Sequence, residues 1–320
     1  MRPTKEIEVL TVAAVREPRE GSQAIECLFN ERQQIFSVTG QAKRRDAVVD
    51  ALREALDRGA PVRAVLNPRR GVVERAEPPD EGERREFHAA RPLLDNPDRA
   101  RRIHVPSVDP TTFNIVDYYL DFPAFKLCRR TIPSYKVARE IFGFCAAQSC
   151  HLPGPPAISH CIPFQYVRDG CYARAHKMRQ IIEEQYRFCC EKVFSFANQD
   201  NDTLAVRAGK WGGCCVTWWY HVAPLVRVRV RIKLPFGTFE LTLAMVIDPG
   251  MFDKPVLLST WLSAQEYTAC ASNANLSMYS VQPGSAYTPA NYAGTLFATD
   301  PTYAQTHTTL TNYQNLTTCP

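Results

Sequence analysis

The sequence lacks a long apolar run. None of its hydrophobic segments reaches the roughly 18 residues that a helix needs to cross a bilayer, so we expect no membrane partner. The first residues, 1–8 (MRPTKEIE), are charged and lack the apolar centre of a signal peptide. These absences leave either an intracellular protein or a secreted one whose leader has been removed.

Two further absences exclude classes of binding partner. The net charge is only +5 and no basic stripe is interleaved with aromatic residues, so we expect no nucleic-acid partner. No Cys-Xaa-Xaa-Cys pair is present, although cysteine-based zinc sites commonly use that spacing. We therefore expect no metal site.

Cysteine, in contrast, is abundant, with twelve residues in the chain. Such a count is typical of a secreted domain held by disulfides, with one or two thiols left free. Cys150 and Cys161 bracket a loop rich in Pro and Gly, at a spacing suited to a disulfide. We expect an extracellular protein, with a cytoplasmic location as the alternative.

The composition changes near residue 130. Residues 1–130 are rich in Arg, Glu and Asp, whereas 132–320 have fewer charges and more Cys, Tyr, Trp, Thr and Asn, which indicates two domains. Periodicity and turn residues predict a small α+β module first, with strands at 8–15, 34–38, 61–66 and 72–76 and helices at 46–58 and 80–88. The residues that follow are punctuated by Pro and are predicted to be a connector.

The second domain is predicted to pack helices on an antiparallel sheet, which makes the fold class α+β. The expected helices span 135–147, capped by Ser134, and 171–186, on which Arg174, Lys177 and Arg179 would face outward. The expected strands span 192–196, 215–222, 225–234 and 239–248. The tail from about 273 is polar but aromatic, and we expect it to wrap irregularly over the domain.

The residues 161–176 (CIPFQYVRDGCYARAH) read as a loop, a tight turn at Asp169-Gly170 and a helix that opens at Cys171. Free N–H groups and the dipole at a helix start favour a thiolate, the reactive form of cysteine. His221 in a predicted strand and Asp248 after the next one complete the order Cys, His, Asp. Papain-like and transglutaminase-like enzymes use this arrangement. A buried thiol, a core histidine and a turn aspartate remain the alternative.

Longer motifs surround these three residues. They are 148–150 (QSC), 161–181, 190–192 (CEK), 214–222 (CCVTWWYHV) and 246–252 (VIDPGMF), followed by Pro255, Val256 and Trp261. Together they resemble the bacterial protein-glutaminase family, the protein-glutamine deamidases. The resemblance covers roughly 132–320 and is strongest from 148 to 262.

The resemblance implies a function for each member of the proposed triad. Cys171 would be the nucleophile, His221 the base and Asp248 the acid that orients it. The reaction would hydrolyse the γ-carboxamide of exposed glutamine in proteins and peptides, through a thioester and with release of ammonia, and it needs no cofactor. The fold expected from the resemblance is a papain/transglutaminase-like thiol hydrolase domain.

Residues 1–130 resemble the pro-region of the same family more weakly, through 51–58, 61–66 and 72–76. This implies an autoinhibited zymogen in which the pro-region is an intramolecular inhibitor and chaperone. An activating protease would cut the connector at about 105–131 and leave 132–320 as the catalytic domain, which we expect to be a monomer. Cys128, Cys145 and Cys189 look additional to the family's usual cysteines, so its disulfide pattern cannot be transferred.

Six further residues are candidates for the substrate cleft. Trp218, Trp219 and Tyr220 flank the base and would line the cleft or pack in the core, since alternate strand residues face opposite sides. Gln148 and Ser149 would assist binding of the substrate amide or simply end a helix. Gln165 is a candidate oxyanion donor, as in papain-like enzymes.

Two alternatives remain open for the function. The same thiol machinery could transfer the acyl group to an amine, as in transglutaminases, or cleave peptide bonds. Ammonia release without amine incorporation or backbone cleavage would distinguish deamidation from both. A non-catalytic binding domain is the third possibility, and the presence of all three triad residues argues against it.

Overall fold

The structure is a computed structural model that describes residues 5–18, 22, 24–89, 128–154, 156–198, 201–234 and 237–316. Most of the predicted connector, 105–127, lies outside the described residues, and so does Cys319. No helix within these ranges is long and apolar enough to cross a membrane.

The N-terminal part packs helix α1 (Ala42–Arg58) against strands. The strands are β1 (Glu6–Arg16), β2 (Ile25–Phe29), β3 (Arg32–Val38), β4 (Pro61–Asn67) and β5 (Val72–Glu77), and helix α2 (Glu81–Ala89) follows them. Helix α1 buries Val48, Val49 and Leu52, the face that its periodicity predicts. It ends at Gly59, whose φ of 59° is the left-handed conformation that closes many helices. The predicted elements are confirmed, and β2 is an additional strand.

The C-terminal part opens with β6 (Thr131–Ile132) and helix α4 (Tyr135–Ala147). Ser134 caps α4 as predicted, since its Oγ accepts the Val137 N–H at 3.3 Å. Helix α5 (Cys171–Glu184) begins at the predicted residue. The remaining elements are β7 (Glu191–Ala197), β8 (Leu204–Ala208), the 3₁₀ turn η2 (Gly209–Trp211), β9 (Cys214–Trp218), β10 (Tyr220–Leu234), β11 (Gly237–Val246), β12 (Val256–Leu257), α6 (Leu258–Ser263), β13 (Leu276–Pro283), β14 (Ala286–Pro289), β15 (Phe297–Thr299) and α7 (Ala304–Tyr313).

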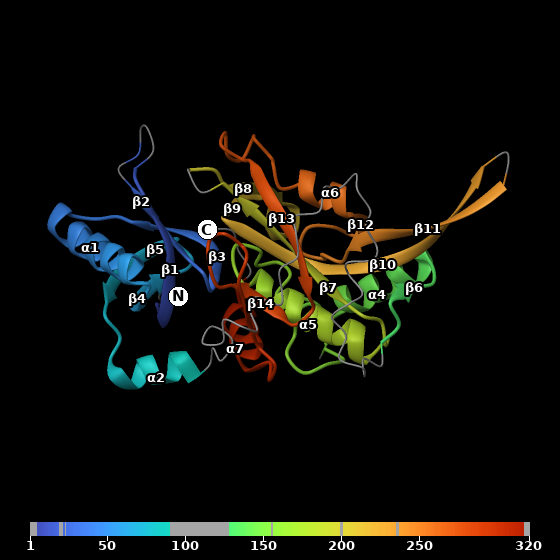
Figure 1. Ribbon diagram of the computed structural model, residues 1–320, viewed down its shortest axis with the longest axis horizontal. Coiled ribbons are helices and arrows are strands. Elements are labelled where there is room, and N and C mark those ends of the chain that lie inside the picture. The colour runs from blue at the N-terminus through green and yellow to red at the C-terminus, as the bar shows by residue number, and fades with distance from the viewer. Residues whose placement is uncertain are drawn as a thin grey trace.

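Helix α5 packs on the central sheet of this part, whose strand order is β12-β11-β10-β7-β13 with β6 beside β10 (Figure 1). Ala175 and Met178 of α5 share one buried core with Val222 and Val226 of β10. Apolar burial of this kind is the main stabilising term in folding. It fixes the start of α5, and therefore Cys171, against the first residues of β10. The mixed α+β class is confirmed.

One strand of the N-terminal part joins the C-terminal part. Strand β3 pairs antiparallel with β9, with Gln34 opposite Trp218. The combined sheet runs β2-β1-β4-β5-β3-β9-β8, and Figure 1 shows β3 on the side of the N-terminal part that faces α5 and α7. The pairing places residues 32–34 beside the end of β9 and the start of β10.

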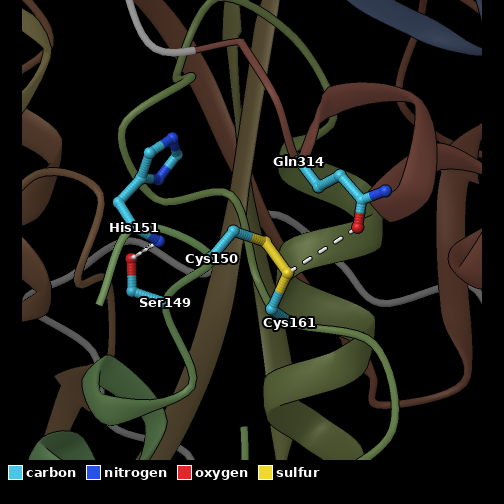
Figure 2. The surroundings of a disulfide bond; sticks show 5 residues. All are labelled: Ser149, Cys150, His151, Cys161 and Gln314. Atoms are coloured by element: carbon cyan, nitrogen blue, oxygen red, sulfur yellow. Dashed lines mark hydrogen bonds between the residues drawn. A yellow bond between two sulfur atoms is a disulfide. The ribbon is translucent and has the colours of Figure 1, made fainter. Parts of the chain in front are cut away.

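Three disulfides are present among the described residues: Cys128–Cys189, Cys150–Cys161 and Cys215–Cys270. The predicted Cys150–Cys161 bridge is confirmed, and it closes the loop that precedes the Cys171 turn (Figure 2). Cys128 and Cys189, two of the additional cysteines, bond each other. Four buried thiols in the described part of the chain are free, more than the one or two expected: Cys27, Cys145, Cys171 and Cys190.

Two predictions of secondary structure are wrong. The strands expected at 215–222 and 225–234 divide at Trp219 instead: β9 ends before this residue, and β10 runs from Tyr220 to Leu234 without a break. The tail expected to be irregular forms β13, β14, β15 and α7 instead. Strand β13 gains its order by pairing with β7, and Asp300 accepts the Thr306 N–H at 2.8 Å in the first turn of α7. Polar sequences give no periodic signal for such tertiary pairing.

Candidate active site

Cys171 is the first residue of α5 and follows the predicted Asp169-Gly170 turn. Gly170 has a φ of +76°, and a Cβ there would lie 2.9 Å from Cδ2 of Tyr313. Only glycine fits both the backbone and the space. The Asp169 carboxylate accepts the Gly170 N–H at 2.7 Å, which holds the turn. The local sequence therefore sets where the thiol points.

His221 and Asp248 form a direct pair. The imidazole Nε2 lies 2.9 Å from Oδ2 of Asp248, and the indole of Trp261 donates to the same oxygen at 2.9 Å. Since a carboxylate only accepts hydrogen bonds, Nε2 carries a proton and Nδ1 is the nitrogen free to take one. The indole of Trp218 stacks on the imidazole with centroids 4.5 Å apart, and Trp261 stacks at 5.4 Å. The ring is thus held in one orientation.

Cys171 contacts the residue after His221. The main-chain N–H of Val222 on β10 acts on the thiol and opposes the rise of its pKa. Helix α5 and strand β10 therefore bring the thiol, the imidazole and the carboxylate to one end of the sheet. These three residues, taken from separate elements, are the ones that the sequence predicts to act together.

The electrostatics of this closed form differ from the sequence prediction. Burial raises the pKa of the Cys171 thiol well above its usual range, against the opposing effects of Arg174 and the Val222 N–H. The prediction that the helix start favours the thiolate is wrong here, because the thiol is almost completely shielded from water. Burial also lowers the pKa of His221, although the Asp248 carboxylate opposes this shift. Both shifts favour a neutral thiol beside a neutral imidazole.

Asp248 stays ionised. Burial opposes its ionisation, yet hydrogen bonds from His221 and Trp261 hold its pKa below the usual value. Its second oxygen accepts the Gly250 N–H at 3.2 Å. A carboxylate fixed in this way can orient the imidazole and stabilise imidazolium when it forms.

A glutamine from the N-terminal part occupies this site. Gln33 is completely buried, and its Oε1 lies 3.3 Å from Nδ1 of His221. Its side-chain amide donates to the Val167 carbonyl at 2.9 Å. Its main-chain N–H reaches the Asp169 carboxylate at 3.2 Å, and its carbonyl accepts the Trp219 N–H at 3.2 Å. The nitrogen expected to take the thiol proton is therefore covered by a residue of the N-terminal part.

The neighbouring Arg32 also contacts the C-terminal part. Its Nη1 lies 3.1 Å from Oδ2 of Asp169, a carboxylate with no exposed surface. The rest of the guanidinium bonds Glu6 at 2.8 Å and Glu8, both within the N-terminal part. Burial raises the pKa of Asp169 and the guanidinium lowers it. A buried carboxylate of this kind needs a positive partner.

The six cleft candidates fall into two groups. Trp218, Trp219 and Tyr220 are all fully buried. Trp218 stacks on the base, and the Trp219 indole donates to the Phe29 and Arg32 carbonyls at 3.2 and 2.7 Å. The Tyr220 hydroxyl is buried and has no hydrogen-bond partner among the residues that the structure describes. All three indeed pack in the core, and the two tryptophans also contact the base or the N-terminal part.

The remaining three candidates lie in the loop region before Cys171. Gln148 is buried and its amide donates to the Phe144 carbonyl at 2.9 Å, which is a helix-ending contact. Figure 2 shows the Ser149 hydroxyl turned toward the His151 N–H, at 3.4 Å. Gln165 is half-buried in the loop that leads to the turn. Their roles in substrate binding stay predictions.

Several residues of the site were not predicted from the sequence. Arg174 was expected to face outward, yet it is buried and donates to the Tyr166 and Asp169 carbonyls at 2.7 and 2.6 Å. Lys177 is buried as well, so that prediction is also wrong. The Tyr313 hydroxyl donates to Asp169 at 3.0 Å. Trp261 was singled out only as part of a motif. None of these contacts has a local sequence signal.

The described residues hold no group of three or more His, Cys, Asp or Glu side chains placed to bind a metal ion. Cys150, Cys161, Cys215 and Cys270 are in disulfides.

Comparisons with known proteins cover both parts of the chain. Residues 138–265 match the model of a family described as glutaminase. The crystal structure of pro-protein-glutaminase superposes with a TM-score of 0.69 at 26% identity, over 98% of this chain and 95% of the other. A mutant of that pro-protein gives 0.66 at 27% identity, over the same shares. The protein-glutaminase of Chryseobacterium proteolyticum is 35% identical over 59% of this chain and 92% of its own, with a TM-score of 0.48. No curated protein sequence matches the chain at a significant level.

The fold and the site thus define a glutaminase domain that still carries the N-terminal region covering its site. The chain belongs to the protein-glutaminase family and corresponds to its pro-form.

Proposed function

We propose that Cys171, His221 and Asp248 catalyse the deamidation reaction of this protein-glutaminase. The enzyme hydrolyses the side-chain amide of glutamine in proteins and peptides to glutamate and ammonia. The observation that carries the assignment is the hydrogen-bonded His221–Asp248 pair, whose Nδ1 lies 3.3 Å from the Gln33 amide oxygen. Cys171 is the first residue of helix α5. The proposed triad is similar to the one that papain-like thiol enzymes use, and we propose the same for its likeness to transglutaminases.

The proposed reaction has two halves. Nδ1 of His221 takes the thiol proton, and the Cys171 sulfur attacks the Cδ atom of the substrate amide. The imidazolium then gives its proton to the nitrogen, the Cδ–N bond breaks, and ammonia leaves a thioester. Water, deprotonated by Nδ1, attacks the thioester, the S–C bond breaks, and glutamate and the thiol are released. Asp248 keeps the imidazole in the required tautomer throughout.

The helix start supplies the groups that stabilise the developing charge. The N–H of Cys171 at the first turn of α5 is a donor for the oxyanion of the tetrahedral intermediate. Gln165 is the proposed second donor, by analogy with papain-like enzymes. Gln148 and Ser149 are proposed to assist amide binding from the loop on the other side of the Cys150–Cys161 disulfide.

The chain carries an intramolecular pro-region. We place it at residues 1–130, with 132–320 as the catalytic domain and cleavage by an activating protease between about 105 and 131. The positions of Gln33 beside His221 and of Arg32 beside Asp169 support the proposal that the pro-region inhibits the enzyme by occupying the active site. A role as folding chaperone follows from the shared sheet through β3 and β9. The mature enzyme is proposed to act as a monomer.

Extracellular function fits the three disulfides, because such bonds persist in oxidising compartments. We therefore propose that the enzyme is secreted and meets its protein substrates outside the cell.

Cleavage of the connector should raise the activity sharply. We expect ammonia release from a glutamine-containing peptide to increase by about a hundredfold or more after limited proteolysis, since the closed form admits no substrate to His221. The measurement is ammonia per mole of chain before and after cleavage. Equal activity in both forms would refute autoinhibition. Amine incorporation or backbone cleavage in place of ammonia would favour the transglutaminase or peptidase alternatives.

The reactivity of the thiol should change in its pH dependence as well. A raised pKa moves the onset of thiolate formation to higher pH, so Cys171 in the uncleaved chain should alkylate only at alkaline pH. Once the pro-region leaves, water reaches the site and the pKa falls, so alkylation at neutral pH becomes fast. The measurement is the rate of iodoacetamide labelling of Cys171 against pH, by peptide mass mapping. An identical pH profile in both forms would contradict the burial argument.

A further inference from the structure

The segment Arg32-Gln33 is bound by the C-terminal part as an extended peptide. Three of its main-chain groups form hydrogen bonds with the C-terminal part. The Gln33 N–H donates to the Asp169 carboxylate at 3.2 Å, and the Gln33 carbonyl accepts the Trp219 N–H at 3.2 Å. The Arg32 carbonyl accepts the Trp219 indole N–H at 2.7 Å. Asp169 and Trp219 are both fully buried. Addition of a strand to a sheet edge in this way is a common mode of peptide recognition.

The position of Gln33 fixes the register of that peptide. Its Oε1 lies 3.3 Å from Nδ1 of His221 while its Nε2 donates to the Val167 carbonyl, so the side chain fills the space beside the base that we assign to a substrate glutamine. The residue before the reacting glutamine then takes the place of Arg32. The residue after it takes the place of Gln34, whose side chain donates back to the Pro68 carbonyl of the pro-region.

The Arg32 side chain has two partners on the catalytic part. The Asp169 carboxylate lies 3.1 Å from Nη1, and the Tyr313 ring lies 5.6 Å from the guanidinium carbon. The Tyr313 hydroxyl donates to the same Asp169 oxygen at 3.0 Å, which orients the carboxylate. Tyr313 is fully buried. Carboxylate and aromatic face together make a site for a planar cation.

The other partners of Arg32 leave with the pro-region. Glu6 and Glu8 belong to β1, so they are absent once a cut before Cys128, which is bonded to Cys189 of the catalytic part, has released the pro-region. Asp169 then keeps its donors from Gly170 and Tyr313 but loses the Arg32 guanidinium and the Gln33 N–H. An incoming peptide with a basic residue before its glutamine restores both contacts.

We infer that the mature enzyme selects glutamines preceded by arginine, through a subsite formed by Asp169 and Tyr313. The inference rests on the proposed function and names part of its substrate specificity. Arginine suits the subsite better than lysine, because its planar group bonds a carboxylate and stacks on an aromatic ring at the same time. A glutamate in this position places a second carboxylate against Asp169 and is disfavoured.

The test compares peptides that differ only before the glutamine. The full chain is treated by limited proteolysis, and ammonia release is measured for acetyl-Xaa-Gln-Gly-amide, with arginine, citrulline, alanine or glutamate as Xaa. Citrulline is the matched control, since it keeps the shape of arginine and loses the charge. We expect kcat/KM for arginine to exceed that for citrulline and alanine by about tenfold to a hundredfold, mainly through KM, with glutamate lowest.

Two variants assign the effect to the subsite. Asp169→Asn removes the charge and should reduce the ratio of arginine to citrulline to about one. Tyr313→Leu removes the aromatic face and should lower the same ratio in part. The ratio of kcat/KM for the arginine and citrulline peptides, measured on one enzyme sample, does not depend on how much of the variant folds. If a variant fails to fold, the peptide series with the wild-type enzyme still tests the inference.

The outcomes separate the two claims. Ammonia from the alanine peptide as fast as from the arginine peptide would overturn the subsite while leaving the glutaminase activity intact. No ammonia from any of the peptides by the cleaved chain would overturn both the proposed function and the inference that rests on it.

Discussion

Replacing Cys171 with alanine is expected to lower the rate of glutamine deamidation by about 10⁴-fold or more, measured as ammonia release from a glutamine peptide after limited proteolysis. The substitution removes the atom that forms the thioester, so water must attack the amide directly. Cys171 packs at the start of α5 in a core of buried apolar residues. The loss of one sulfur atom should therefore leave the fold in place, and the effect should fall on kcat.

The matched control is Cys145→Ala. Cys145 is also a free and fully buried thiol, but it lies on α4 among apolar side chains. Its removal should cost some stability through a small cavity and leave turnover per folded molecule unchanged. A Cys171→Ala chain that still releases ammonia at the wild-type rate would show that the nucleophile has been misassigned. Parallel losses in both variants would point to unfolding instead.

Replacing Arg32 with alanine should activate the uncleaved chain. The guanidinium is only 4% exposed and joins the buried Asp169 to the half-buried Glu6 and Glu8. Removing one partner of a buried ion pair costs about 3–5 kcal/mol, because a charge is left without compensation. Opening the site returns Asp169 to water, so this cost shifts the population toward the open form. At the lower figure the basal activity rises by about a hundredfold.

The control for this variant is Arg53→Ala. Arg53 pairs with Glu17 on the surface of the N-terminal part, where the two side chains are 44% and 75% exposed. Exposed pairs of this kind contribute little, so the basal activity should not change. Ammonia release by the uncleaved chains is compared for both variants and the wild type. If Arg32→Ala stays as inactive as the wild type before cleavage, the ion pair does not hold the pro-region on the site.

Several local features could be predicted because their causes are local. Helix α4 was predicted with its observed bounds, since Ser134 is a capping residue and the apolar spacing is helical. The turn before Cys171 was predicted from Asp169-Gly170, and the structure gives its reason in the short approach of Tyr313 to Gly170. The Cys150–Cys161 bridge was predicted from a short loop between two cysteines. Each of these inferences involves residues close in the chain.

The contacts that complete the site join distant residues. Trp261 reaches Asp248 only because α6 folds back beside β11, and Tyr313 reaches Asp169 from the last helix. Arg174 was expected to be exposed because its charge suggests solvent, yet two loop carbonyls accept its protons. A buried charge of this type is stable only with such partners, and the sequence around it does not reveal them.

By itself, the sequence determined the α+β class and the family motifs, and it predicts the two-part organisation and the order Cys171, His221, Asp248, because short-range periodicity and residue chemistry carry this information. Only the tertiary structure decided that the thiol is held neutral by burial, and that Gln33 and Arg32 occupy the site. These features depend on the pairing of β3 with β9, which joins residues far apart in the chain. Desolvation and register are properties of the packed molecule, so no local pattern in the sequence specifies them.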